Sequence, residues 1–194
     1  VSRAEFVRPV HWITMLYGSD VVQGSLFGLA AGNETRGHRF MSTGTLGLTH
    51  ASAYVEVLRA ASVLVDFAER QNEIEKQIVA LAVTEGATAI IDPDLLEEVT
   101  ALVEWPRALC GHFDPAFLSV PGEALISAMK LHQRYFHMVD GDGQLLGKFI
   151  TIANIDSKDP AAVIAGNERV IRPRLADAAF FYEQDGKSTL QEKA

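Results

Sequence analysis

The first part of the chain has the residue pattern of β-strands separated by a tight turn. Residues 7–17 are rich in Val, Ile, Thr, Trp and Tyr, and Pro9 stands near the start, where a strand tolerates proline. Gly-Ser-Asp at positions 18–20 predicts a turn, and residues 21–29 predict a second strand. The two segments together predict a hairpin, followed by a polar, basic connection over residues 33–41.

The middle of the chain changes to the period of amphipathic helices. Ile74, Ile78 and Ala82 recur at intervals of four, and Gly86 follows them as a typical helix end. This spacing places the three apolar side chains on one face of a helix, which we expect to pack on a core. The predicted helix covers residues 68–86.

Two further helix starts are marked by capping residues. Asp92 precedes Pro93, and a carboxylate caps exposed N–H groups while proline suits the first helical position. This predicts a helix over residues 93–103. Ser52 is expected to cap an earlier helix over residues 52–61 in the same way, and the short apolar run at 63–67 is expected to form a buried strand.

The C-terminal half alternates between strand and helix signals. The clearest hairpin surrounds Asp-Gly-Asp-Gly at 140–143, whose glycines accept positive φ. The last helix runs from residue 160 to about 183 and contains Pro173, so we expect a kink or a restart there. The other predicted elements are strands at 105–113, 135–139 and 145–155 and a helix at 122–132.

These elements predict an α+β fold, with a mixed, largely antiparallel sheet with hairpins packed with about five helices. The 194 residues suit a single domain over 1–194. Hydrophobic residues make up 48% and charged residues 22%, as in soluble globular proteins, and no apolar run is long enough to cross a membrane. The single cysteine, Cys110, excludes an internal disulfide, so we expect a cytoplasmic protein.

Motifs for catalysis are absent from the sequence. Neither a G-x-G-x-x-G nor a G-x-x-x-x-G-K-[ST] phosphate loop occurs, and no G-x-S-x-G nucleophile turn is present. The six histidines never take the H-x-x-x-H spacing of a helical metal site, and Glu97 and Glu98 diverge by about 100° on a helix. The pattern therefore predicts no catalytic residue and no metal ligand.

Charge narrows the possible partners. The net charge of −8 argues against a domain that holds DNA or RNA by bulk charge, although a local basic patch needs only a few cations. Such cations contact phosphates or pair with acidic neighbours, and the pattern alone favours structural ion pairs in this acidic chain. The RNA-binding candidates form three clusters: Arg36, His38 and Arg39; Lys130 and Arg134; and Arg169, Arg172 and Arg174.

Several of these segments belong to longer motifs that together span nearly the whole chain in one order. They are FVRPVHW (6–12), RGHRFM (36–41), LLEEV (95–99), VEWP (103–106), FLSVPGEAL (117–125), HQRYF (132–136), FITIANIDSKDP (149–160) and GNERVIRPRLADAAFF (166–181). In these motifs the sequence resembles the β subunit of bacterial glycyl-tRNA synthetase, the large non-catalytic partner of an α2β2 enzyme.

The resemblance implies a division of labour in protein biosynthesis. The α subunit would bind ATP and Mg²⁺ and activate glycine, whereas the β subunit would bind tRNA(Gly) and complete the assembly. The chain would be an internal fragment, whose last helix leads into a missing C-terminal half. We therefore expect the isolated fragment to need no cofactor, to be catalytically inactive and to bind neither DNA nor a membrane.

Two other roles remain open for the fragment. The region also resembles the central domain of the phenylalanyl-tRNA synthetase β subunit, which edits in that enzyme, and this implies a hydrolytic proofreading domain that acts on mischarged tRNA. Glycine is the smallest amino acid, so steric exclusion alone rejects larger ones and makes editing the less favoured role. The third possibility is a purely structural spacer.

Overall fold

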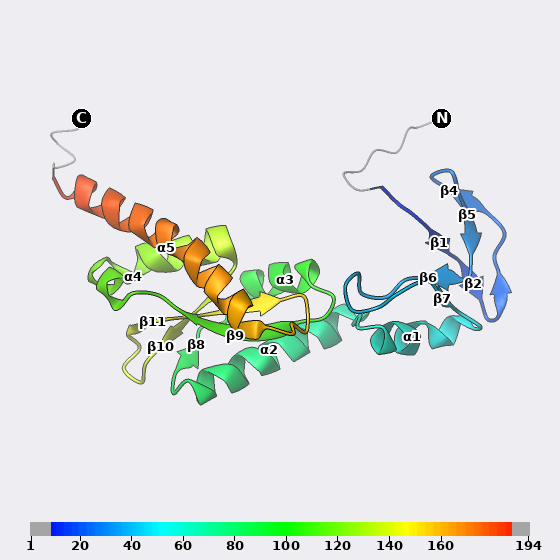
Figure 1. Cartoon of the computed structure of the whole chain (residues 1–194), viewed down its shortest axis with the longest axis horizontal. Helices are drawn as coiled ribbons and strands as arrows, with labels where there is room; N and C mark the ends of the chain where they lie inside the picture. The colour runs from blue at the N-terminus through cyan, green and yellow to red at the C-terminus, as the bar shows by residue number, and fades with distance from the viewer. Residues whose placement is uncertain (1–8, 188–194) are drawn as a thin grey trace. The chain divides into compact units, whose positions relative to one another are not determined.

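The computed structural model describes residues 9–187, which fold into two compact units with a boundary at Asp66–Phe67. Both contain helices and antiparallel strands, which confirms the predicted α+β class (Figure 1). Whether residues 1–194 act as a single domain stays a prediction. Among the described helices, none combines the length and the apolar composition that crossing a membrane requires.

The first unit is built from short strands and one helix. Its core includes Leu48, Leu58 and Leu64. The strands form a three-stranded sheet in the order β1-β5-β4 and two hairpins, β2-β3 and β6-β7. The elements are β1 (Ile13–Thr14), β2 (Leu16–Tyr17), β3 (Asp20–Val21), β4 (Ser25–Leu26), β5 (Leu29–Gly32), β6 (Glu34–Thr35), β7 (Leu46–Gly47), η1 (Ala51–Ala53) and α1 (Tyr54–Ala60).

The first predicted hairpin is confirmed, but its strands are broken into pieces. Tyr17 pairs with Asp20 across a turn in which Gly18 has a φ of +61°. The prediction for residues 7 and 8 lies outside the described residues.

Two expectations are wrong: residues 63–66 form no strand and lead directly into a helix, and His50 rather than Ser52 accepts the capping hydrogen bond. A short apolar run without a partner strand cannot be distinguished from an irregular segment by its pattern.

The second unit contains a four-stranded antiparallel sheet in the order β8-β10-β11-β9. Asp140 accepts hydrogen bonds from the backbone N–H groups of Asp142 and Gln144, and Gly143 has a φ of +77°, so the predicted turn is confirmed. The strands are β8 (Thr88–Ala89), β9 (Arg107–His112), β10 (Phe136–Val139) and β11 (Leu145–Ala153).

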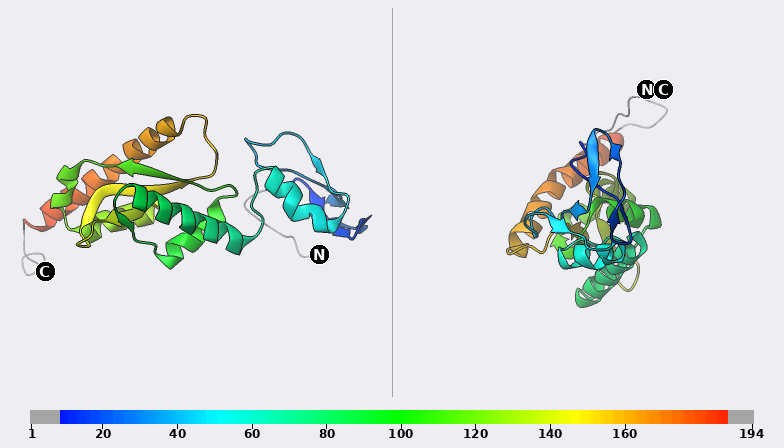
Figure 2. Two further views of the ribbon diagram at one scale, coloured as in Figure 1. Left: turned by 90° about the horizontal axis from the view of Figure 1, so that it is seen from below. Right: turned by 90° about the vertical axis from the view of Figure 1, so that its right-hand side faces the viewer.

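Helices cover both faces of this sheet. Adjacent strand residues point to opposite faces, so neighbouring residues of β11 enter different cores. Ile150 lies in a core with α2 (Phe67–Thr84) and α3 (Pro93–Leu102), and Phe149 lies in a second core with α4 (Gly122–Ser127) and α5 (Pro160–Asp185). Figures 1 and 2 show α5 running along the sheet on the face opposite to α2. Two shorter helical segments are η2 (Pro115–Ser119) and η3 (Ala128–Gln133).

The helix boundaries follow the predicted caps with two differences. The Asp92 carboxylate accepts a hydrogen bond from the Leu95 N–H, and Pro93 is the first residue of α3, as predicted. The predicted helix over 122–132 changes after Ser127 into η3, which has π geometry and ends at Arg134 with a φ of +56°. The expected interruption at Pro173 is wrong in one respect, since α5 continues without a restart through this residue.

Candidate functional site

The basic cluster of the first unit lies in the loop after β6. Arg36 and Arg39 are exposed, and the Arg36 guanidinium lies 5.6 Å from the ring centroid of Trp12, a cation–π contact. His38, in contrast, is only 1% exposed, and its Nδ1 accepts a hydrogen bond from the Phe40 N–H. We therefore expect His38 to shape the loop that presents the two arginines, rather than to contact phosphate itself.

Gly37 allows this loop to pack against the end of α1. A Cβ at this position would stand 2.4 Å from the Ala61 Cβ and 2.7 Å from the Ala61 carbonyl oxygen. The same carbonyl accepts a 2.9 Å hydrogen bond from the His38 N–H. The backbone approach thus excludes any side chain at residue 37.

The second cluster is neutralised by α3. Lys130 Nζ donates a hydrogen bond to Asp92 Oδ2 at 2.5 Å, and Arg134 Nε donates to Glu98 Oε1 at 2.8 Å. The Lys130 ammonium and the Leu95 N–H together lower the pKa of Asp92. These two cations are the structural ion pairs that the sequence pattern favoured, and they hold η3 and its end against α3.

The third cluster lies on α5 and differs from Lys130 and Arg134 in having no partner carboxylate among the described residues. Arg169, Arg172 and Arg174 are all exposed, and among residues 9–187 no ion pair joins any of them to an acidic side chain. Arg174 and Asp177, three residues apart, do not pair. Their charges are therefore available to a partner molecule.

Helix geometry divides these three arginines between two flanks of α5. Ile171 and Leu175 are fully buried and mark the face that packs on the sheet. At 3.6 residues per turn, Arg169 and Arg172 lie about 60° apart around the helix axis, whereas Arg172 and Arg174 lie about 160° apart. Arg169 and Arg172 thus form one basic flank, and Arg174 belongs to the other.

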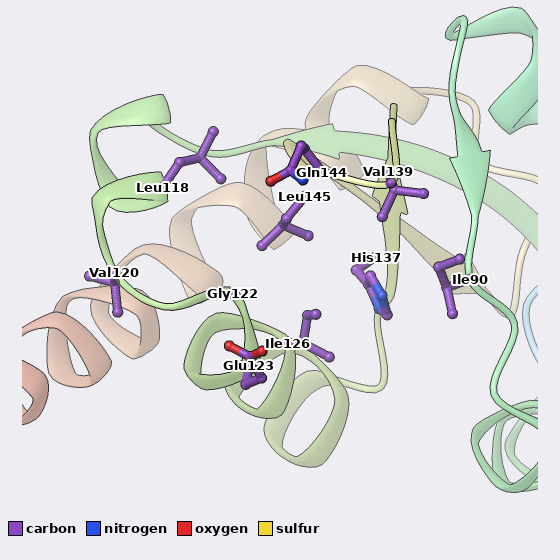
Figure 3. A pocket seen from close by; sticks show the side chains of 11 residues that line it. Ile90, Leu118, Val120, Gly122, Glu123, Ile126, His137, Val139, Gln144 and Leu145 are labelled. Carbon is purple, nitrogen blue, oxygen red and sulfur yellow. The ribbon is translucent and has the colours of Figure 1, made fainter. Parts of the chain in front are cut away.

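A separate pocket of about 480 Å³ opens between α4 and the edge of the sheet at β8 and β10. Figure 3 shows aliphatic side chains, among them Ile126 and Leu145, around it together with Glu123, His137 and Gln144. Burial lowers the pKa of His137, so its imidazole is neutral at neutral pH. A neutral imidazole that lines such a pocket is able to accept a proton.

Comparison with known proteins gives the family of the chain. The sequence pattern described as "Glycyl-tRNA synthetase beta subunit" matches residues 1–194. The chain belongs to this family.

Its curated relatives are much longer than the chain. It is 56% identical over 189 residues to the "Glycine--tRNA ligase beta subunit" of Chromohalobacter salexigens, an alignment that covers 97% of this chain and 28% of that protein. The proteins of the same name from Marinobacter nauticus and Colwellia psychrerythraea are 54% and 52% identical over 193 and 192 residues. These alignments cover 98% and 99% of the chain and, in both cases, 28% of the relative, so the chain spans little more than a quarter of their length.

Sequence reasoning missed two groups of side chains in this member of the glycyl-tRNA synthetase beta subunit family. The pocket combines residues from 90 to 145, and no local spacing relates Ile90 to Glu123. The second group gathers Glu85, after the end of α2, with Cys110 and His112 of β9; one donor atom from each lies within 4.8 Å of the others. The Cys-x-His spacing on a strand, which places both side chains on one face, is the only local signal of this group.

Proposed function

We propose that this chain is the region of the β subunit of glycine–tRNA ligase that contributes tRNA binding and subunit assembly. In the complete cytoplasmic α2β2 enzyme, the α subunit would activate glycine with ATP and Mg²⁺, and this region would contact tRNA(Gly). The family match supports the placement in this ligase. The observation that favours RNA contact is the basic flank of Arg169 and Arg172, whose charges have no carboxylate partner among the described residues.

Arginine suits this role because its planar guanidinium donates paired hydrogen bonds to phosphate oxygens. Each phosphate that a cation neutralises also releases counterions, so even two such contacts contribute to affinity. Lys130 and Arg134 are less suitable, since Asp92 and Glu98 already neutralise them. The flank of α5 is therefore the part of the second unit that we assign to RNA.

The test is charge reversal in the full α2β2 enzyme. Arg172→Glu should raise KM for tRNA by about 10-fold, the loss expected for one charged hydrogen-bonded contact, while glycyl-adenylate formation measured by pyrophosphate exchange stays unchanged. Lys76→Glu, the same charge change at an exposed position of α2, is the matched control and should alter neither reaction. Unchanged tRNA kinetics in a well-folded Arg172→Glu enzyme would remove this flank from the RNA surface and favour the spacer role.

One observation favours the proofreading role as a second candidate: the pocket that is lined by both Glu123 and the neutral imidazole of His137. His137 could activate water there for attack on the ester of a mischarged tRNA. The full enzyme would then hydrolyse alanyl-tRNA(Gly), and His137→Ala would abolish this hydrolysis without changing glycylation. Equal hydrolysis by the wild-type enzyme and the His137→Ala variant, or no hydrolysis by either, would reject the proofreading role.

A further inference from the structure

A mixed set of donor atoms meets where the end of β9 approaches the residue after α2. Glu85 offers a carboxylate oxygen, Cys110 a sulfur and His112 a ring nitrogen, all within 4.8 Å of one another. His112 Nε2 lies 4.0 Å from Glu85 Oε2. Cys110 and His112 share one face of β9, which the alternation of strand residues fixes.

The second ring nitrogen of His112 faces another carboxylate. His112 Nδ1 lies 3.7 Å from Glu168 Oε1, and the same oxygen accepts a 2.8 Å hydrogen bond from the His112 backbone N–H. Histidines that bind metals usually have such a carboxylate behind the ring, because it fixes the ring orientation and the tautomer. Glu168 therefore favours a His112 that presents Nε2 toward Glu85 and Cys110.

We propose that Glu85, Cys110 and His112 form a binding site for a borderline-soft divalent cation, best represented by Zn²⁺. Sulfur, imidazole nitrogen and carboxylate oxygen together match Zn²⁺ and disfavour Mg²⁺ or Ca²⁺, which prefer oxygen donors. Tetrahedral bonds to Zn²⁺ place donor atoms about 3.5 Å apart, so the three side chains must close by roughly 1 Å. The His112 side chain is 55% exposed, which leaves the fourth position accessible to water.

Binding requires two local changes. The Cys110 S–H bond breaks as the Zn–S bond forms, and the proton leaves to solvent. Lys148 must also release Glu85, because its Nζ donates a 2.8 Å hydrogen bond to Glu85 Oε2 and a 3.1 Å hydrogen bond to the Glu85 carbonyl oxygen. The Lys148 ammonium and the metal ion compete for the same Glu85 carboxylate oxygen, so removal of this ammonium should strengthen metal binding.

The experiment is a titration of the chain with Zn²⁺ by calorimetry and with Co²⁺ by absorption spectroscopy. Because the chain has one cysteine, a thiolate-to-cobalt charge-transfer band assigns Cys110 as a ligand directly. We expect one ion per chain. His112→Ala and Glu168→Gln should each weaken Zn²⁺ binding about 10- to 100-fold, whereas Lys148→Met should strengthen it by removing the competing cation.

His132→Ala, which removes an exposed imidazole at the end of η3, is the matched control and should leave the Zn²⁺ affinity unchanged. His112 is also largely exposed, so its variant tests the site without disturbing the core. Absence of the charge-transfer band, or Zn²⁺ binding that is equal in the wild type, His112→Ala and Lys148→Met, would overturn the proposal.

Discussion

Gly37 has the tightest packing constraint among the residues of the basic loop. Replacement by alanine would place a methyl group against the backbone carbonyl and side chain of Ala61, neither of which has a flexible end that can move away. We expect Gly37→Ala to destabilise the first unit by about 1–3 kcal/mol, the usual cost of overpacking. The measurement is urea unfolding in a Trp105→Phe background, which leaves Trp12 as the fluorescent reporter of this unit.

Gly24→Ala provides the control, because a Cβ there meets nothing within 4 Å. It should change the free energy of unfolding by less than about 0.5 kcal/mol. Equal urea midpoints for the two variants would show that the loop does not pack on α1 as described.

Residue identity alone predicted which cations to consider but not which of them have partners. Lys130 and Arg134 find Asp92 and Glu98, 38 and 36 residues earlier in the chain, because the fold brings η3 beside α3. Asp177 is only three residues from Arg174 and yet does not pair with it. Sequence distance is a poor guide to ion pairing when tertiary contacts decide which charges meet.

At the scale of elements, the N-terminus of α3 combines a cap with an ion pair in the single residue Asp92. Its pKa is lowered, first by the Lys130 hydrogen bond and then by the Leu95 N–H. A carboxyl group with a lowered native pKa stabilises the fold above its unfolded pKa of about 3.9, and this contribution is lost as pH falls through the native value.

Asp92→Asn keeps an oxygen that can cap the helix but removes the charge that attracts Lys130. We expect it to lower the free energy of unfolding by less than about 1 kcal/mol at pH 7, and the difference from the wild type should vanish once acid has protonated Asp92. Urea midpoints between pH 7 and pH 2.5 measure this, with Asp94→Asn as the neighbouring control. A difference that persists unchanged at the lowest pH would assign the effect to packing rather than to charge.

Caps and turns made several elements predictable, whereas tertiary packing decided the exceptions. Asp92-Pro93 and the Asp-Gly-Asp-Gly turn specify local hydrogen bonds, so their elements agree with the prediction. Pro173 removes one N–H donor from α5, but Ile171 and Leu175 on either side are buried in the core, and this packing favours a continuous helix. The two-residue strands, such as β8, are too short to leave a periodic signal.

At the scale of the whole molecule, the family motifs predicted more than the residue patterns did. The α+β class agrees with the expectation from the predicted elements, and the membership in the glycyl-tRNA synthetase beta subunit family agrees with the expectation from the motifs. The division into two compact units was not predicted, because residues 63–66 resemble a buried strand rather than a boundary. The pocket and the Glu85–Cys110–His112 group could not be predicted, since only the folded sheet brings their members together.

The acidic charge of the whole chain sets the expected strength of RNA binding by the fragment. With a net charge of −8, the isolated chain should bind tRNA(Gly) weakly and lose binding steeply as salt increases. Submicromolar binding that survives high salt would contradict this expectation.

The same chain, which lacks the motifs of amino-acid activation, should show no glycine-dependent pyrophosphate exchange.

The central claim is that the α5 flank of Arg169 and Arg172 contacts tRNA phosphates in the complete enzyme. The most direct measurement is the salt dependence of the tRNA(Gly) affinity of the α2β2 enzyme, compared between the wild type and an Arg169→Gln, Arg172→Gln double variant. Loss of two phosphate contacts should reduce the slope of log K against log salt concentration by roughly 1.4 to 1.8. An identical slope and affinity in a folded double variant would contradict the claim.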